Sequence, residues 1–253
     1  MNGLSEHIEI EKGLVSICIP VWRSAIFPSF FKSFVEMEKP ENYKYEHIIM
    51  GDLNIAHARN MCIKRARGEF LLFLDPDMVI HKDLLKNLLK ICDDEHPIVS
   101  GLYYSRWPPY KVQAYTFSDD GWIPDWNHPI DKPFETQGIG MGCCLMKREI
   151  CNKIDYPWFA FQHEGGTEDL PFCKKVIDAG FKIMIDPIVL CGHITDYIIK
   201  GPIMISTYNP RTDGEPFANL EFKDVSKLIG KETMGDTHSA EHEGELKKIN
   251  GDK

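Results

Sequence analysis

The sequence predicts an α/β protein with a mainly parallel central sheet, and two features support this prediction. Over the first hundred residues, short β-branched and aromatic runs alternate with segments whose apolar residues have helical spacing. One run, "EFLLFL" at residues 69–74, is almost entirely apolar, as expected of a strand covered on both faces. With 253 residues and 43% hydrophobic content, the chain can form one domain with a substantial core.

In the first half, the expected elements alternate in order along the chain. Strands are expected at residues 13–22, 45–51, 69–74 and 96–104, and helices at 24–39, 54–68 and 81–94. Pro28 should lie in the first turn of the first helix, where a missing N–H does no harm. Gly68 is predicted to close the second helix.

The second half begins with residues 105–136, a segment rich in proline and aromatic residues that is expected to form loops, either as a binding surface or as a cover for the sheet. A strand and a helix resume at residue 138. A further helix is expected over 166–181, with Thr167 as its N-cap and Gly180 as its stop. A strand interrupted by Pro187 follows, so we expect one domain over residues 1–212 and a polar tail, partly helical or mobile, over 213–253.

The charge of the chain indicates which partners to expect, and its cysteines indicate the compartment. A net charge of −9 without a Lys/Arg block argues against a nucleic-acid partner, although a local basic pocket for phosphate remains open. Eight cysteines without a CxxC pair indicate a reducing compartment. The chain shows no leader peptide and no run of about 20 apolar residues, so we expect a soluble, cytoplasmic protein without a transmembrane segment. No pattern indicates an oligomeric state.

The strand at 69–74 runs directly into two carboxylates, Asp75 and Asp77, which flank Pro76. Ligands of open α/β sheets bind at the carboxyl ends of the strands, and proline stiffens the turn there. Two neighbouring carboxylates repel each other unless a cation or hydrogen-bond donors intervene, and their oxygen ligands favour Mg²⁺ or Mn²⁺. The alternative is a turn that ends the strand and caps the next helix.

The order of several motifs resembles the GT-A glycosyltransferases, particularly family 2. The motifs are "VSICIP" (15–20), "ARNMCIKRARG" (58–68), "LLFLDPD" (71–77), "GIGMGCCLMKRE" (138–149), "TEDLPFCKKVIDAGFKIMID" (167–186) and "CGHI" (191–194). The resemblance covers roughly residues 14–195. It implies the GT-A fold, with a Rossmann-like, nucleotide-binding half over about 13–104 and a smaller mixed region over about 105–212 that binds the acceptor and completes the metal site.

The resemblance also implies a cofactor and a donor. A nucleoside-diphosphate sugar, UDP-sugar first, would lie across the strand ends with Mn²⁺ or Mg²⁺ bridging its phosphates. Asp77 would bind the metal directly, Asp75 would contact the metal or the ribose, and His193 would complete the metal site. Without the resemblance, a lone histidine is more often a partly buried side chain with a satisfied hydrogen bond.

The catalytic base is assigned by the same resemblance. Asp169 would remove the proton of an acceptor hydroxyl on a glycan or another molecule, and Glu168 would contact the acceptor or act as the alternative base. Without the resemblance, both acids would simply stabilise a helix start, and a carboxyl pKa lowered there would oppose basicity. Direct displacement would invert the anomeric centre.

The remaining candidates concern the donor and the acceptor. By resemblance, Pro20, Val21 and Trp22 line the base and ribose pocket, with Arg59 near the nucleotide or the metal loop and Asp52 as a uracil contact. The backbone of Gly140, Met141 and Gly142 would face the donor sugar. Arg106, Trp107 and Tyr110 would form a lid or the acceptor face.

Three other functions stay open on the sequence. A retaining GT-A enzyme carries similar acids. A nucleotidyltransferase also uses acids and a divalent ion, but it needs a glycine-rich basic loop after the first strand, and "IPVWRSAIF" has no glycine. A noncatalytic carbohydrate-binding domain would keep the fold without turnover.

Overall fold

The computed structural model describes residues 9–22, 26–119, 121–162 and 167–195, and beyond these only the backbone of three short strands at 198–199, 204–206 and 222–224. Of Trp22, only the backbone is described. The predicted tail at 213–253 therefore lies outside the described residues, apart from the short strand at 222–224.

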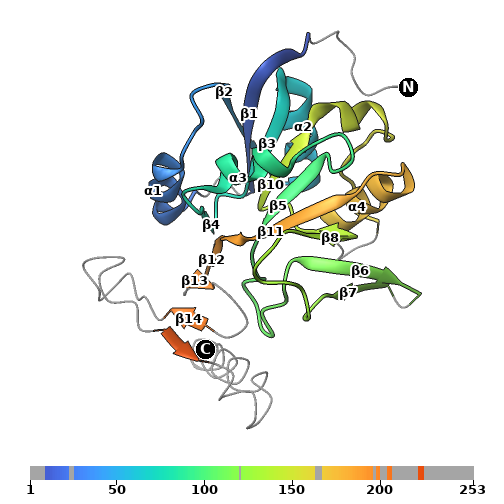
Figure 1. Cartoon of the computed structure of the whole chain (residues 1–253). Helices are drawn as coiled ribbons and strands as arrows, with labels where there is room; N and C mark the ends of the chain where they lie inside the picture. Colours follow the sequence, from blue (N-terminus) through green and yellow to red (C-terminus); the bar gives the residue numbers. More distant parts are fainter. Residues whose placement is uncertain are drawn as a thin grey trace, which may run out of the picture.

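A seven-stranded sheet forms the centre of the molecule, in the order β2-β1-β3-β10-β5-β11-β8 (Figure 1). Its strands are β1 (Glu11–Trp22), β2 (Lys44–Asp52), β3 (Gly68–Leu74), β5 (Ile98–Leu102), β8 (Phe134–Thr136), β10 (Cys143–Lys147) and β11 (Ile183–Leu190). The pairs β1·β2, β1·β3 and β5·β11 are parallel, whereas β10 runs antiparallel to both β3 and β5, and β8 runs antiparallel to β11. The predicted α/β class with a mostly parallel sheet is confirmed.

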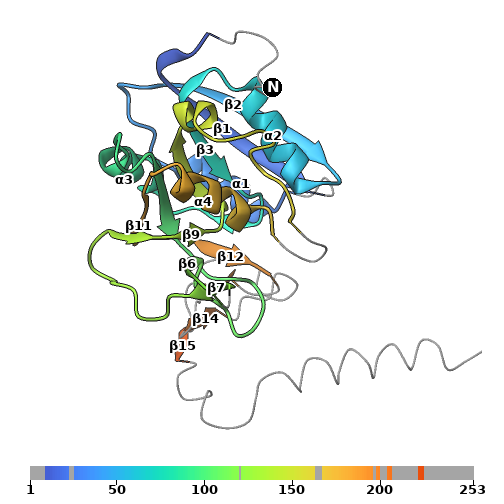
Figure 2. The same cartoon turned by 90° about the vertical axis from the view of Figure 1, so that its right-hand side faces the viewer.

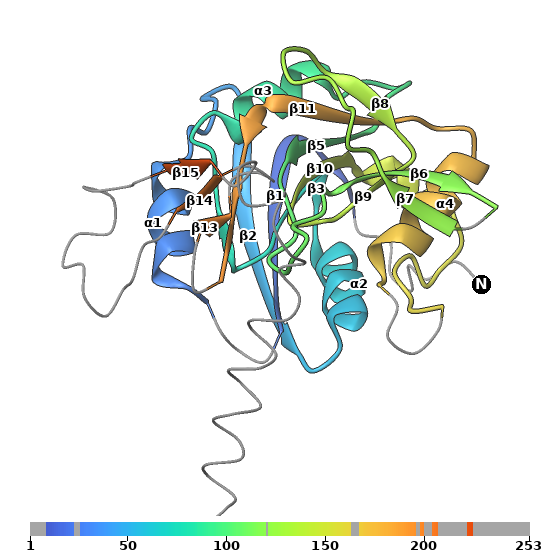
Figure 3. The same ribbon diagram turned by 90° about the horizontal axis from the view of Figure 1, so that it is seen from below.

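Helices cover both faces of this sheet (Figures 1 and 3). They are α1 (Pro28–Glu36), α2 (Ile55–Arg65), α3 (Leu84–Ile91), α4 (Asp169–Asp178) and the 3₁₀ turn η1 (Arg148–Asn152). Residues of α1 and α3 pack in one core cluster and residues of α2 and α4 in another, and β3 contributes alternate side chains to the two clusters. This explains why β3 reads as a continuous apolar run. None of the described helices is long and apolar enough to cross a membrane.

Two small sheets lie beyond the carboxyl ends of the central strands (Figure 2). One contains β4 (Met78–Val79), β12 (Gly192–Ile194), β13 (Ile198–Ile199), β14 (Met204–Ser206) and β15 (Phe222–Asp224). The other contains β6 (Ala114–Ser118), β7 (Gly121–Pro124) and β9 (Gly138–Ile139). The segment 105–136, expected to form loops, therefore supplies strands β6, β7 and β8.

Two predicted helix ends are wrong. Helix α2 ends at Arg65 with Ala66 as its C-cap, and Gly68 instead begins β3, because it pairs with Glu11 of β1. Helix α4 begins at Asp169 with Glu168 as its N-cap, not Thr167, and no side chain caps it. The predicted stop is confirmed, since Gly180 follows the helix with a φ of +88°.

Pro187 does not end β11 but lies in an irregularity of its pairing with β5, between Asp186 and Leu190.

Gly68 offers a test of the close approach between β1 and β3. A Cβ placed on Gly68 would lie 2.7 Å from the carbonyl oxygen of Leu14 and 2.6 Å from Oγ of Ser16. We expect Gly68→Ala to push the two strands apart and lower the free energy of unfolding by about 1–3 kcal/mol. Urea denaturation would measure this loss, and an unchanged midpoint would contradict the close approach.

Candidate functional site

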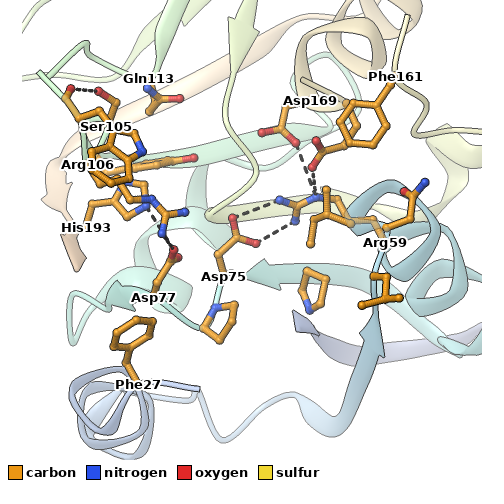
Figure 4. Close-up of a pocket in the computed structure, with 18 residues that line it drawn as sticks. Phe27, Arg59, Asp75, Asp77, Ser105, Arg106, Gln113, Phe161, Asp169 and His193 are labelled. Carbon is orange, nitrogen blue, oxygen red and sulfur yellow. Dashed lines mark hydrogen bonds and ion pairs between the residues drawn. The ribbon is translucent and has the colours of Figure 1, made fainter. Parts of the chain in front are cut away.

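A cavity of about 700 Å³ opens at the carboxyl ends of the central strands (Figure 4). Polar and aromatic side chains from the strand ends, α2, α4 and the loop after β5 line it. The lining residues are Pro20, Phe27, Leu53, Asn54, Ile55, Arg59, Asp75, Pro76, Asp77, Tyr103, Ser105, Arg106, Trp107, Gln113, Phe161, Glu168, Asp169 and His193. Elements from both halves of the chain thus meet at the edge of the sheet where α/β proteins bind ligands.

The turn Asp75–Pro76–Asp77 is held by backbone hydrogen bonds on both sides. The N–H of Asp75 donates to the carbonyl of Gly142 (2.9 Å), and the N–H of Ile194 donates to the carbonyl of Asp77 (2.7 Å). Strand β4, directly after the turn, pairs antiparallel with β12, with Met78 opposite His193. This pairing places His193 next to Asp77, although the two residues are far apart in the sequence.

Asp77 contacts two basic side chains, those of Arg106 and His193 (Figure 4). Its Oδ2 lies 2.8 Å from Nη1 of Arg106 and 3.6 Å from Nε2 of His193. Burial alone would raise the pKa of the Asp77 carboxyl, but the contact with His193 and the charge of Arg106 outweigh it and lower the pKa. The carboxylate therefore stays ionised in a largely buried position.

The ring of His193 is fixed from its other side. Its Nδ1 lies 2.9 Å from the carbonyl oxygen of Tyr104, which can only accept, so Nδ1 carries a proton. In the neutral ring, Nε2 then points a lone pair toward Oδ2 of Asp77, and two acceptors face each other across a gap that suits a cation. Asp77 and His193 therefore fit a shared metal ion.

Asp75 faces a different partner, Arg59 of α2 (Figure 4). Arg59 is only 2% exposed and lies between three carboxylates. Its Nη2 donates to Oδ2 of Asp75 (3.1 Å), and its Nε donates to Oε1 of Glu168 (2.9 Å) and lies 3.6 Å from Oδ1 of Asp169. Burial opposes the charge of Arg59, but Asp75, Asp169 and Glu168 together raise its pKa. We name these four residues the Arg59 cluster.

One guanidinium cannot neutralise three buried carboxylates. The pKa is therefore raised for two of the three carboxyls and lowered for the third. Burial, the charge of Glu168 and the charge of Asp75 raise the pKa of Asp169 well above its usual value, despite Arg59. Burial also raises the pKa of Asp75. Burial acts in the same sense on Glu168, but Arg59 outweighs it and lowers the pKa of that carboxyl. Burial and like charges therefore outweigh the lowering of the pKa that a helix start alone would give Asp169.

Two carboxylate oxygens of the cluster, Oδ1 of Asp75 and Oδ1 of Asp169, are buried without a hydrogen bond. Oδ1 of Asp75 lies 3.0 Å from Nη1 of Arg59, but the two are not aligned for hydrogen bonding. Buried acceptors without a donor are rare and costly, so these two oxygens depend on the nearby charge of Arg59.

The three predicted metal ligands divide between two places. Within the described ranges, no group of three or more His, Cys, Asp or Glu side chains lies close enough to hold a metal ion. Asp77 and His193 are together, whereas Asp75 is paired with Arg59.

Of the residues predicted to contact the donor, some line the cavity and others do not. Pro20 and Arg59 line the cavity, but Val21 is buried in the core, and the side chain of Trp22 is outside the described residues. Asp52 does not line the cavity. Its carboxylate accepts from the N–H of Asn54 (2.8 Å) and contacts Nδ1 of His57 (2.6 Å), and these contacts lower its pKa.

The segment Gly140–Met141–Gly142 lies behind the cavity wall and does not line it. The N–H of Gly142 donates to the hydroxyl of Tyr103 (3.0 Å), and the N–H of Met141 donates to Oδ2 of Asp169 (3.3 Å). A Cβ on Gly140 would lie 2.0 Å from the Tyr103 hydroxyl. The glycines thus let the backbone approach Tyr103 closely.

Several lining residues were not predicted from the sequence. They are Phe27, Leu53, Asn54, Ile55, Pro76, Tyr103, Ser105, Gln113 and Phe161. Asn54 carried a usable signal, because it stands before an amphipathic helix and its side chain caps α2 by accepting from the N–H of His57. Tyr103 had no such signal, since it lies at the end of an apolar strand and is only 4% exposed.

The motif "ARN" also has a structural explanation. Asn60 donates from its side chain to the carbonyl of Phe159 (2.8 Å) and accepts from the N–H of the same residue (3.1 Å). It thereby anchors the segment that carries Phe161 to the cavity, while the neighbouring Arg59 holds the acids.

Comparison with known proteins agrees with this geometry. A family model described as "Glycosyl transferase family 2" matches residues 27–155, about half of the chain. A curated protein of Bacillus subtilis (strain 168), "Uncharacterized glycosyltransferase YfnE", is 40% identical over 53 residues, which are 21% of this chain and 14% of that protein. The matched region is therefore far less than two thirds of the relative's length.

A solved structure, "Crystal Structure of A197 from STIV", shares the fold. It is 16% identical, the similarity covers 83% of this chain and 94% of that chain, and the TM-score is 0.53. At this identity the likeness concerns the fold alone. The family match over half of the sequence establishes that the chain belongs to glycosyl transferase family 2, a family of glycosyltransferases (EC 2.4).

Proposed function

We propose that the protein transfers a sugar from a nucleoside-diphosphate donor, a UDP-sugar, to an acceptor hydroxyl with inversion at the anomeric carbon. The observation that carries the proposal is the convergence of Asp75, Asp77, His193 and Asp169 on one cavity at the carboxyl end of β3. In such a site the acids and the histidine can bind a cation and a diphosphate, while a carboxylate activates the acceptor.

The diphosphate end of the donor is assigned to the region of Asp77 and His193. These two residues would hold Mn²⁺ or Mg²⁺, with Asp75 as a further ligand or as a ribose contact. A divalent ion bound there would offset the negative charge that collects on the departing diphosphate. The facing acceptors Oδ2 of Asp77 and Nε2 of His193 support this assignment.

Asp169 is proposed as the base that removes the acceptor proton, with Glu168 as the residue that contacts the acceptor. The raised pKa of Asp169 and the lowered pKa of Glu168 support this order, because a carboxylate with the higher pKa accepts a proton more readily. Oδ1 of Asp169 is buried without a hydrogen-bond partner, and an acceptor hydroxyl, such as that of a glycan, bound in the cavity that Asp169 lines would supply the missing donor.

The nucleoside is assigned to the side of the cavity that Pro20, Leu53 and Asn54 line. Asp52 is next to Leu53 in the sequence and remains our candidate for a uracil contact, and Val21 and Trp22 remain candidates for the base and ribose contacts. Gly140, Met141 and Gly142 would act behind the donor sugar through Tyr103 and Asp169. A reducing compartment such as the cytoplasm is supported by the eight cysteines, all of which are free thiols.

Asp77→Asn tests the proposed role of the carboxylate. With Mn²⁺ and a panel of nucleotide sugars, we expect transfer to fall by about 10²-fold or more, because a neutral amide binds the ion and offsets charge poorly. The exposed Asp131→Asn is the matched control. Circular dichroism should show the same fold for both variants, and unchanged turnover in Asp77→Asn would refute the role.

A further inference from the structure

The loop after β5 places a guanidinium on Asp77, a carboxylate that the proposed function assigns to cation binding. Nη1 of Arg106 lies 2.8 Å from Oδ2 of Asp77, the same oxygen that lies 3.6 Å from His193. Arg106 therefore occupies one side of this oxygen.

The base of this loop is fixed, whereas its tip is exposed. The N–H of Ser105 donates to the carbonyl of Lys111 (2.7 Å), and Tyr104 forms a β-bridge with Val112. At the tip, 36% of the Arg106 side chain and 68% of Trp107 are exposed. Arg106 can therefore change its partner by turning its side chain, while the base of the loop stays in place.

The other basic side chains of the described cavity wall, Arg59 and His193, already have fixed partners. Arg59 is buried and shared among three carboxylates, so it cannot turn to a ligand without leaving them unpaired. His193 is oriented by the carbonyl of Tyr104. Among the described lining residues, Arg106 is the arginine that can reach an incoming anion.

A diphosphate must enter a cavity lined by four carboxylates, Asp75, Asp77, Glu168 and Asp169. One guanidinium group can donate hydrogen bonds to two phosphate oxygens at once. Because it is only weakly hydrated, it loses little hydration when it binds them. We propose that Arg106 changes partner on donor binding, from Asp77 to the donor diphosphate. This inference rests on the proposed function and adds a residue that recognises the leaving group.

If Arg106 exchanges partners, Asp77 and the diphosphate compete for it. While Asp77 is ionised and without another cation, it holds Arg106 and competes with the diphosphate for it. Loss of the Asp77 charge should therefore release Arg106 and strengthen diphosphate binding, and this gain should require Arg106. Simple repulsion between Asp77 and phosphate would give a gain that does not depend on Arg106.

Calorimetric titration with UDP, GDP, dTDP and ADP separates these possibilities. With saturating Mn²⁺, we expect Arg106→Gln to weaken binding of the preferred diphosphate about tenfold or more, and Lys111→Gln, which removes a charge from the same loop outside the cavity, to change it less than about twofold. In metal-free buffer, Asp77→Asn should bind the diphosphate more tightly than wild type. The double variant with Arg106→Gln should lose this gain.

Each outcome is decisive. If wild type binds none of the four diphosphates with or without Mn²⁺, the proposed function fails. If wild type binds one of them but Arg106→Gln leaves the affinity unchanged, or Asp77→Asn gains nothing in metal-free buffer, or its gain survives in the double variant, the exchange is wrong and the proposed function stands. Equal melting temperatures of the variants would exclude a loss of fold.

Discussion

Asp169→Asn will lower sugar transfer by about 10²–10⁴-fold, the usual contribution of a general base, while the affinity for the donor stays within about twofold. An asparagine in this position keeps an oxygen that can accept from the N–H of Met141, so the start of α4 should stay intact. It cannot take a proton from the acceptor. Single-turnover transfer and calorimetric binding of UDP would measure the two effects separately.

The control for this variant is Asp178→Asn at the other, exposed end of α4, which should leave both quantities unchanged. Weakened donor binding with normal turnover in Asp169→Asn would contradict its role as base. Such a result would move the role to Glu168 or to a group outside the described residues.

The pH dependence of transfer gives an independent readout of the same role. Because the pKa of Asp169 is raised, the ionised base is lost as the pH falls through a value above that of an ordinary aspartate, about 4. The acid limb of kcat/KM should therefore lie above this value. Glu168→Gln removes a charge that raises the pKa of Asp169, so the limb should move to lower pH, although the apparent value belongs to the coupled pair.

Arg59→Met will lower the free energy of unfolding by about 3–5 kcal/mol near neutral pH, as expected when one partner of a buried ion pair is removed. Asp75, Glu168 and Asp169 would then stay buried without their cation. Arg65→Met, at an exposed position on the same helix, should cost less than about 0.5 kcal/mol. Urea denaturation would compare the two variants with wild type.

The sign of the pH dependence distinguishes this cause from lost packing. Without Arg59, the folded state would bind protons on the three carboxyls more tightly than the unfolded state does. Stability should therefore rise as the pH falls toward about 5, and the deficit relative to wild type should shrink. A deficit that is the same at every pH would show that the packing of Arg59 near Phe73 and Phe159, not its charge, supports the fold.

The sequence was most informative where the physics is local. The apolar run of β3 required cover on both faces, and the acids after it had to lie at the strand end, so the position of Asp75 and Asp77 was predictable. The end of α2 was not, because the pairing of Gly68 with β1 is a contact between distant segments that outweighs the helix-stop signal of glycine.

The partners of the site residues were less predictable than their positions. Arg59 was expected near the nucleotide or the metal loop, and it does contact Asp75, but its pairing with Glu168 and Asp169 of the distant α4 start was not predicted. Arg106 was expected in a lid or on the acceptor face, and its contact with Asp77 depends on a loop whose path no periodicity specifies. Gly140–Gly142 was expected to face the sugar, yet it packs against Tyr103, because residue spacing does not reveal what backs a strand end.

The gap between Asp77 and His193 is proposed to receive a divalent ion together with the donor diphosphate. Anomalous diffraction from crystals soaked with Mn²⁺ and UDP tests it most directly. We expect a manganese peak within coordination distance of Oδ2 of Asp77 and Nε2 of His193, about 2.0–2.3 Å, with the diphosphate on the same ion and Arg106 turned toward it. Bound UDP with no manganese at these two side chains would contradict it.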